Sequence, residues 1–337
     1  MVQCLTKTLR RTLNNLCLLD SSVLAFLLYF NFRLLWAPES EDSHVAQAAF
    51  QGALLLSVLG AVLCRGELIT NQRARGITHR FIMMISVLGL YLVAMREALF
   101  ALKPTLLDSQ LATIDTLIFG VVPAQWLEQF ARPLVTEWFA FFYFSYFTLI
   151  GIAIFPSAFL GRSELSRGLV LGPILIVCIG HVGYTLIPGR GPYVALHFKN
   201  ELQGGYFWDL VNQAVTAQGA LLDIFPSLHT AMPCFLLGYL FVRRRLWPFK
   251  FPWVIAWSLI LFFTVNIIIA TMFLRWHYGV DVIAGALLAL MVIWLVCRYN
   301  PSDEVRASKG RHPIFEPCFG SSLDRDKLQN LSKKKIT

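Results

Sequence analysis

The chain has 337 residues, of which 56% are hydrophobic and only 15% charged, and this composition excludes an ordinary soluble domain. Its apolar residues fall in runs long enough to cross a bilayer. The formal net charge is +9, but the basic residues lie in short loops between these runs. That arrangement is typical of membrane topology and not of a nucleic-acid-binding surface. The sequence therefore predicts an all-α, polytopic integral membrane bundle that binds no nucleic acid.

The apolar runs predict about eight transmembrane helices. The first run lacks a small-residue cleavage site, so we expect a retained membrane helix and not a cleaved signal. No internal repeat accompanies the runs, which gives no support to a transporter built from inverted repeats. The predicted helices span residues 16–36, 45–64, 81–101, 136–160, 168–187, 227–243, 252–272 and 278–297.

Residues 103–135 differ from the flanking runs. They mix apolar and polar residues at roughly helical spacing, interrupted at Gly120 and Pro123. This pattern predicts one or two amphipathic helices in the membrane interface, with an ordinary loop and a lid-like helix as the alternative. The predicted organisation is three N-terminal transmembrane helices, an interfacial segment, a catalytic transmembrane core and a solvated, basic cytoplasmic tail, at 1–102, 103–135, 136–298 and 299–337.

The distribution of basic residues predicts the topology. Most of the 29 Lys and Arg residues lie before the first helix, in every second loop, or in the tail. Basic loops remain on the cytoplasmic side, so both termini are predicted to be cytoplasmic. Five polar residues then fall together on the outer, periplasmic or luminal, side: Arg190, His229, Arg275, His277 and Asp281.

Two short motifs carry the chemistry. His277 and Asp281 are four residues apart at the start of an apolar helix, which places both side chains on one face. The aspartate can hold one imidazole N–H and make the other ring nitrogen a better nucleophile. A second histidine, His229, begins another apolar helix. We predict His277 as a phosphate-attacking nucleophile, Asp281 as its orienting partner, and His229 as the general acid and later base.

A phosphate also needs groups that hold its nonbridging oxygens. Ser227 stands where an N-cap would stand, so its hydroxyl and the free N–H groups of the helix are candidates. Arg190 and Arg275 are the available cations, and Arg suits bidentate phosphate contact. Tyr184 and Tyr193 are further candidates, with packing or loop support as their alternative roles.

Metal and cofactor are not expected. Two histidines and an aspartate could hold zinc in principle, but the Ser227 turn and the arginines favour an anion between them. The seven cysteines form no CxxC pair and are expected to be packing residues without disulfides. Four histidines in loops are expected to be solvated: His44, His79, His197 and His312.

The sequence FPSLH followed by RWHYGVD resembles the second and third motifs of the type 2 phosphatidic acid phosphatase superfamily, which includes the vanadium haloperoxidases. That pattern is Lys-x6-Arg-Pro, then Pro-Ser-Gly-His, then Ser-Arg-x5-His-x3-Asp. The inositol phosphorylceramide synthases of fungal type and their bacterial relatives similarly carry Pro-Ser-Leu-His and His-Tyr-x-x-Asp. The resemblance implies that His277 becomes phosphorylated with Asp281 as its partner, that His229 is the acid and base, and that Pro226 and Ser227 bind phosphate.

The chain departs from the superfamily pattern at two places. Ala270 and Thr271 stand where the third motif has Ser-Arg, and Arg275 is the nearest replacement. Arg190 begins an Arg-Gly-Pro sequence that could stand for the first motif, but Gly183 occupies the position of its lysine. With fewer cations on the phosphate, a diester donor fits better than phosphatidic acid, because it carries less charge.

These observations predict a membrane enzyme that transfers or hydrolyses the phosphoryl group or phospho-headgroup of a membrane lipid through a phosphohistidine. Water as acceptor would make it a lipid phosphate phosphatase. A lipid hydroxyl would make it a phosphotransferase of the inositol phosphorylceramide synthase kind, which the resemblance favours. A non-catalytic lipid transporter or scaffold is the alternative from another class, and it would tolerate His277→Ala.

Overall fold

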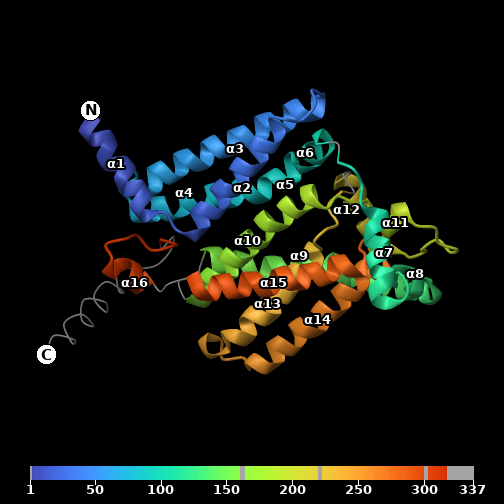
Figure 1. Ribbon diagram of the computed structural model, residues 1–337. Coiled ribbons are helices and arrows are strands. Elements are labelled where there is room, and N and C mark those ends of the chain that lie inside the picture. Colours follow the sequence, from blue (N-terminus) through green and yellow to red (C-terminus); the bar gives the residue numbers. More distant parts are fainter. Residues whose placement is uncertain (1, 103, 160–163, 219–221, 300–302, 317–337) are drawn as a thin grey trace.

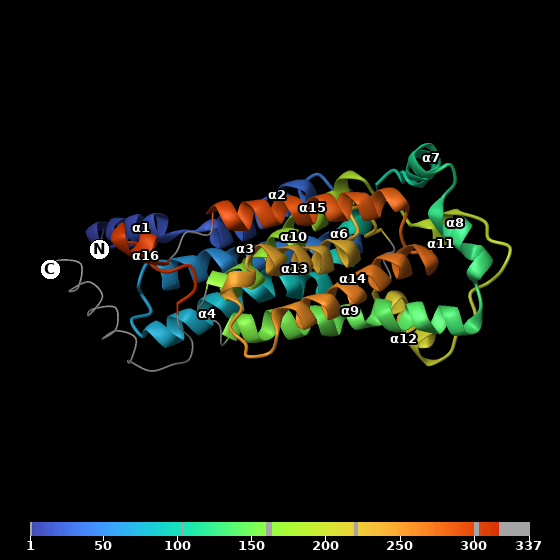
Figure 2. The ribbon, with the colours of Figure 1, turned by 90° about the horizontal axis from the view of Figure 1, so that it is seen from below.

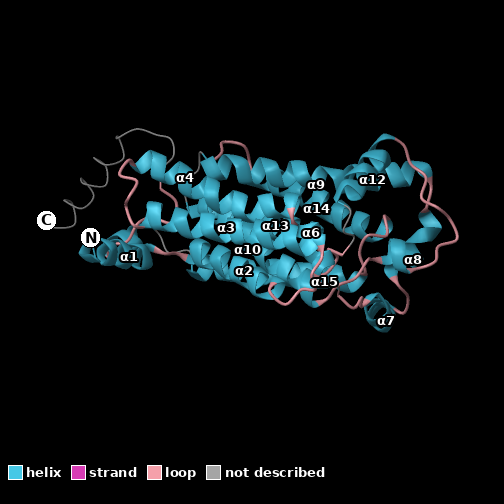
Figure 3. Ribbon diagram, turned by 90° about the horizontal axis from the view of Figure 1, so that it is seen from above, coloured by secondary structure: helices cyan, strands magenta, loops and turns pink. Residues whose placement is uncertain are grey.

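The computed structural model describes residues 2–102, 104–159, 164–218, 222–299 and 303–316, and all regular structure in these ranges is helical (Figures 1 and 3). The predicted all-α fold is confirmed. In chain order the elements are α1 (Val2–Asn15), α2 (Leu18–Leu34), α3 (Glu41–Arg65), α4 (Gln72–Met84), the π-helical turn η1 (Ile85–Gly89), α5 (Leu90–Val93), α6 (Met95–Ala101), α7 (Asp108–Phe119), α8 (Pro123–Leu127), the 3₁₀ turn η2 (Glu128–Phe130), α9 (Pro133–Phe159), α10 (Glu164–Leu186), α11 (Pro192–Ala195), α12 (Tyr206–Gln218), α13 (Leu228–Val242), the 3₁₀ turn η3 (Arg244–Leu246), α14 (Trp253–Phe273), α15 (Gly279–Tyr299) and α16 (Asp303–Ser308).

The described helices make the protein a multi-pass membrane protein. Six stretches are long and apolar enough to cross a bilayer, namely α3, α4 with η1 and α5, α9, α10, α14 and α15. A seventh span exists if α1 and α2, which meet at a bend of 103°, are counted as one. Each predicted run thus has a helical counterpart, but α13 has only 15 residues. Such a helix is about 22 Å long and is therefore shorter than the hydrocarbon core.

The spanning helices form because their backbone groups must be hydrogen-bonded internally in lipid, and apolar side chains cover them. Polar residues define where they begin. At α3, Ser40 accepts a hydrogen bond from the Ser43 N–H, and the Ser43 hydroxyl accepts one from the Ser40 N–H. Acidic residues follow in the first turn and Arg65 ends the last turn, which matches the helix dipole.

Helix α10 occupies the middle of the bundle. The helices α2 to α6 lie on one side of it, with α2 and η1 in contact with it, and α9, α13, α14 and α15 lie on the other, where α9, α13 and α15 contact it (Figure 1). Seen from below in Figure 2, the bundle is long. Helices α1 and α16 lie at one end, and α7, α8, α11 and α12 lie at the opposite end. The segment predicted to be interfacial therefore forms part of one end of the bundle, next to the start of α15.

A buried charge cluster joins the N-terminal helices. The Asp20 carboxylate on α2 accepts hydrogen bonds from Arg65 Nε at 3.0 Å and from His79 Nε2 at 2.5 Å. All three side chains are almost completely buried. The prediction that His79 is solvated was wrong, because a carboxylate enclosed by membrane helices requires partners and His79 supplies one of them.

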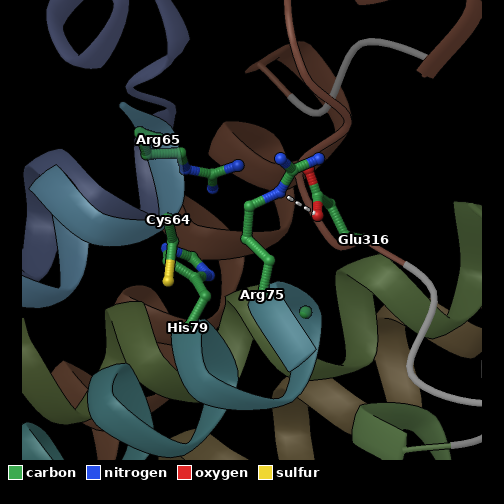
Figure 4. Close-up of a pocket in the computed structure, with 6 residues that line it drawn as sticks. Cys64, Arg65, Arg75, His79 and Glu316 are labelled. Atoms are coloured by element: carbon green, nitrogen blue, oxygen red, sulfur yellow. Dashed lines mark hydrogen bonds and ion pairs between the residues drawn. The ribbon is translucent and has the colours of Figure 1, made fainter. Parts of the chain in front are cut away.

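The described part of the tail, residues 303–316, packs on this cluster. Arg65 also donates to the carbonyl oxygens of Pro313 and Ile314, and Arg75 pairs with Glu316 at 2.6 Å (Figure 4). The prediction of a solvated tail is therefore wrong for residues 312–316, which are buried or half-buried by these contacts, whereas residues 308–311 are exposed. Residues 317–337, including the terminal lysines, lie outside the described residues.

The structure also overturns the prediction for a second histidine. His312 was expected to be solvated, but its Nε2 lies 2.6 Å from a carboxylate oxygen of Glu67, and its side chain is largely buried. His44 and His197 are exposed, as expected. Five cysteines are free, namely Cys17, Cys64, Cys178, Cys234 and Cys297.

Candidate active site

His277 lies in the turn between α14 and α15, two residues before α15 begins. The N–H groups of Trp276 and His277 both donate to the Thr271 carbonyl oxygen, at 3.0 and 3.1 Å. Asp281, in the first turn of α15, accepts the Tyr278 N–H at 2.9 Å. Its Oδ2 lies 3.5 Å from His277 Nδ1. His277 and Asp281 are therefore in contact as predicted, but Nδ1 has no hydrogen-bond partner among the described residues, and His277 precedes the helix and does not lie on it.

His229 faces this turn from the first turn of α13. The ring centroids of His229 and His277 are 6.3 Å apart. The Ser227 N–H donates to the Asp281 carbonyl oxygen at 3.1 Å, so the two motifs are joined directly. The Ser227 hydroxyl makes no cap bond to α13 and accepts from the Thr230 hydroxyl at 3.2 Å. The structure thus brings together the residues of both motifs, with Pro226 buried beside them.

Two aromatic rings of α9 hold the His229 imidazole. Tyr143 stacks on it with centroids 4.3 Å apart and planes at 14°, and Tyr146 lies at the same distance. Among the described residues, the buried His229 Nε2 has no hydrogen-bond partner. Sequence reasoning missed both tyrosines, because nothing distinguishes them from the neighbouring Phe and Tyr residues of this helix.

Arg275 points away from the two histidines and into the loops at this end of the bundle. Its backbone is in the left-handed region, with φ of 70°. The guanidinium donates to the Asn200 carbonyl oxygen at 2.7 Å, lies 3.8 Å from the Phe198 ring centroid, and is 3.7 Å from Glu128. Burial lowers the pKa of Arg275, whereas Glu128 raises it. In this arrangement the guanidinium is engaged by protein groups, and a phosphate contact would require it to turn.

Arg190 has an exposed side chain on a loop that is held through its backbone. Its N–H donates to both carboxylate oxygens of Asp108 at 3.0 Å, and the Gly191 N–H donates to Asp108 Oδ1 at 2.9 Å. The structure therefore brings the Arg190 backbone to the site end of the bundle and leaves the guanidinium free of recorded contacts within the described residues.

The two predicted tyrosines differ in position. The Tyr193 N–H donates to the Arg275 carbonyl oxygen at 2.7 Å, and its ring packs on Trp276 with centroids 4.9 Å apart. Tyr193 thus supports the turn that carries His277. Tyr184 is buried in α10 with its ring 5.4 Å from that of His181, so it belongs to the interior packing below the site.

Sequence reasoning missed Asp115. This buried carboxylate on α7 accepts the N–H groups of Gly279 and Val280, each at 2.7 Å. Burial raises the pKa of the Asp115 carboxyl, and the two backbone hydrogen bonds oppose that shift. One sequence signal could have found it. Asp108 and Asp115 are seven residues apart in a predicted helix, so they share a face.

Among the described residues, no group of three or more His, Cys, Asp and Glu side chains lies close enough to hold a metal ion. The site combines the imidazoles of His229 and His277, whose ring centroids are 6.3 Å apart, with the Ser227 hydroxyl and the start of α13. Imidazoles and helix N-termini together suit a phosphate group.

The fold and the site define a multi-pass helical membrane protein with a histidine pair between two helices. Residues 109–295 match the PAP2 superfamily, and the chain belongs to this superfamily. The matched region runs from α7 through α15 and contains both histidine motifs, so the predicted resemblance is confirmed at the level of the superfamily. No curated protein and no solved structure matches the chain. Membership supports a lipid enzyme of the phosphatase or phosphotransferase type.

Proposed function

We propose that the protein transfers the phosphoryl group or phospho-headgroup of a membrane lipid through a phosphohistidine at His277. One observation carries the proposal. The rings of His229 and His277 face each other with centroids 6.3 Å apart, and Asp281 contacts Nδ1 of the His277 ring. Both rings can contact one phosphoryl group at that separation. Because His277 Nδ1 faces Asp281, Nε2 is the nitrogen available for attack.

In the first half-reaction the lone pair of His277 Nε2 forms a bond to phosphorus. The bond from phosphorus to the leaving oxygen breaks, and protonated His229 gives its proton to that oxygen. Asp281 stabilises the positive charge on the His277 ring. The Ser227 hydroxyl and the N–H groups at the start of α13 are the candidates for the nonbridging oxygens, with Arg190 at the rim.

In the second half-reaction neutral His229 takes the proton of an acceptor hydroxyl. The acceptor oxygen bonds to phosphorus as the bond to His277 breaks, which restores both histidines. We favour a lipid hydroxyl over water as the acceptor, as in the inositol phosphorylceramide synthase branch. The burial of Ser227, His277 and Asp281 supports this choice, because a closed site limits access of water.

The alternative acceptor, water, would make the protein a lipid phosphate phosphatase. The remaining alternative is a non-catalytic transporter or scaffold that has the same fold. The Nε2 of His229 supports catalysis over that alternative, because this buried atom has no hydrogen-bond partner among the described residues and its ring lies beside His277, where a phosphoryl oxygen would satisfy it.

Turnover of labelled phospholipids by the purified protein tests the proposal, with and without diacylglycerol or ceramide as acceptor. The expected result is a new phospholipid that forms only with the acceptor, and complete loss of turnover in His277→Ala. The variant His44→Ala is the control, because His44 is an exposed histidine outside the site. An acid-labile phosphate on a His277 peptide would identify the intermediate.

Each alternative gives a different result in the same experiment. Inorganic phosphate as the only product would replace transfer with hydrolysis. Full turnover by His277→Ala would exclude the phosphohistidine, and failure of the wild-type protein on every phospholipid would favour the scaffold.

We also propose that the site end of the bundle faces the periplasm or lumen and that both termini are cytoplasmic. The basic loops at the opposite end support this orientation. Cysteines introduced at Tyr193 and Arg11, which are both exposed, test it with a membrane-impermeant maleimide. Labelling of the first from the cytoplasmic side would reverse the orientation.

A further inference from the structure

Three consecutive N–H groups directly after His277 are bound by carboxylates. The Tyr278 N–H donates to Asp281, and the N–H groups of Gly279 and Val280 donate to Asp115. The first N–H groups of a helix have no partner within the helix, and a nearby side chain normally satisfies them. Here the partner of two of them comes from α7, 164 residues earlier in the chain.

The second carboxylate of α7 binds the same turn from another direction. Asp108 Oδ1 accepts the Tyr278 hydroxyl at 3.1 Å, in addition to the N–H groups of Arg190 and Gly191. One side chain therefore ties the loop of Arg190 to the residue that follows His277. Asp108 and Asp115 lie two helical turns apart, so one face of α7 makes both sets of contacts.

The packing around this face is close. A Cβ on Gly279 would lie 2.5 Å from the Phe119 ring and 3.0 Å from Pro123, so a side chain at this position would displace the Phe119 ring. Neither Asp108 nor Asp115 has an ion pair with Lys or Arg within the described residues. A buried carboxylate that binds only N–H and hydroxyl donors costs desolvation energy that an apolar contact would not.

We infer that Asp108 and Asp115 are positioning residues of the proposed reaction, and that α7 holds the His277 turn in register with His229. The inference rests on the proposed function. It assigns to the segment around α7 a role in holding the nucleophile and the Arg190 loop, beyond covering the end of the bundle. Asp115 fixes the backbone on the C-terminal side of His277, and Asp108 fixes the distance from that turn to the Arg190 loop.

The test compares steady-state kinetics of Asp115→Asn and Asp108→Asn in the full-length protein. An amide accepts at one atom only, so Asp115→Asn loses one of the two N–H bonds and should lower kcat about 100-fold with little change in KM. Asp108→Asn loosens the Arg190 loop and should raise KM roughly tenfold. Asp209→Asn is the control, because Asp209 is an exposed carboxylate at the same end of the bundle.

A purely structural cap predicts another result. It would lower the unfolding temperature of Asp115→Asn but leave kcat per folded molecule at the wild-type value, and this outcome would overturn the inference. If Asp115→Asn does not fold, Tyr278→Phe removes only the hydroxyl that binds Asp108, and an unchanged KM there would also overturn the role of Asp108. The variant His277→Ala distinguishes failure of the proposed function from failure of this inference. Turnover by that variant would refute the proposed function, whatever the aspartate variants do.

Discussion

Gly285 lies where α15 crosses the start of α13, and a methyl group added there would separate the two helices. A Cβ at this position would be 2.4 Å from the Ser227 carbonyl oxygen and 3.1 Å from the Thr230 Cβ. The first contact is with backbone, so a side-chain rotation cannot relieve it. Normal contact requires the helices to move apart by about 1 Å. Because Ser227 precedes His229 and Gly285 follows Asp281 by one helical turn, that movement would also separate the two histidines.

The expected effect of Gly285→Ala on activity is larger than its effect on folding. Overpacking of this kind costs about 1–3 kcal/mol of stability, which a domain of this size can tolerate. Misplacement of reacting groups by about 1 Å costs about 100-fold in rate. We therefore expect a folded variant with a lower unfolding temperature and about 1% of the wild-type turnover.

The assay is lipid-phosphate turnover per folded molecule, with the thermal unfolding midpoint measured on the same samples. Gly52→Ala in α3 is the matched control, because a Cβ there meets nothing within 4 Å. It should leave both quantities at their wild-type values. Turnover of Gly285→Ala at the wild-type rate would refute the reasoning, since it would mean that the spacing of α13 and α15 does not set the distance between the histidines.

Three further outcomes follow from the contacts. Asp20→Asn leaves the buried Arg65 guanidinium without its carboxylate and should cost about 3–5 kcal/mol. Glu97→Gln breaks a more exposed pair and should cost less than about 1 kcal/mol, so equal shifts in unfolding midpoint would contradict this ranking. Tyr143→Leu removes the ring that stacks on His229, the proposed general acid, and should reduce kcat, whereas Tyr143→Phe should not; equal rates would exclude a role for stacking. The hydrogen bond from His312 lowers the pKa of Glu67 below its ordinary value of 4.5, so the stabilisation is present above that value and is lost as the pH falls through the lowered pKa. Hydrogen exchange of residues 303–316, corrected for the intrinsic rate, should increase in acid in the wild type and not in Glu67→Gln.

The sequence was sufficient for the properties that depend on local pattern. Apolar runs of about 20 residues predict spanning helices, because only a helix hydrogen-bonds its own backbone in lipid. The four-residue spacing of His277 and Asp281 predicts that their side chains lie close together, and His277 Nδ1 is 3.5 Å from Asp281 Oδ2. The topology placed His229 on the same side, and its ring faces His277. The chemical roles of these residues stay predictions.

Only the tertiary structure decided which polar groups become partners across long separations. His79 binds Asp20 inside the N-terminal helices, although its loop position indicated solvent. Arg275 was expected at the phosphate, but its left-handed backbone and the Asn200 carbonyl oxygen direct it elsewhere. Asp115 meets α15 from a helix 164 residues away. A polar side chain binds the groups that packing brings within about 3 Å, and that choice depends on remote elements which no local pattern encodes.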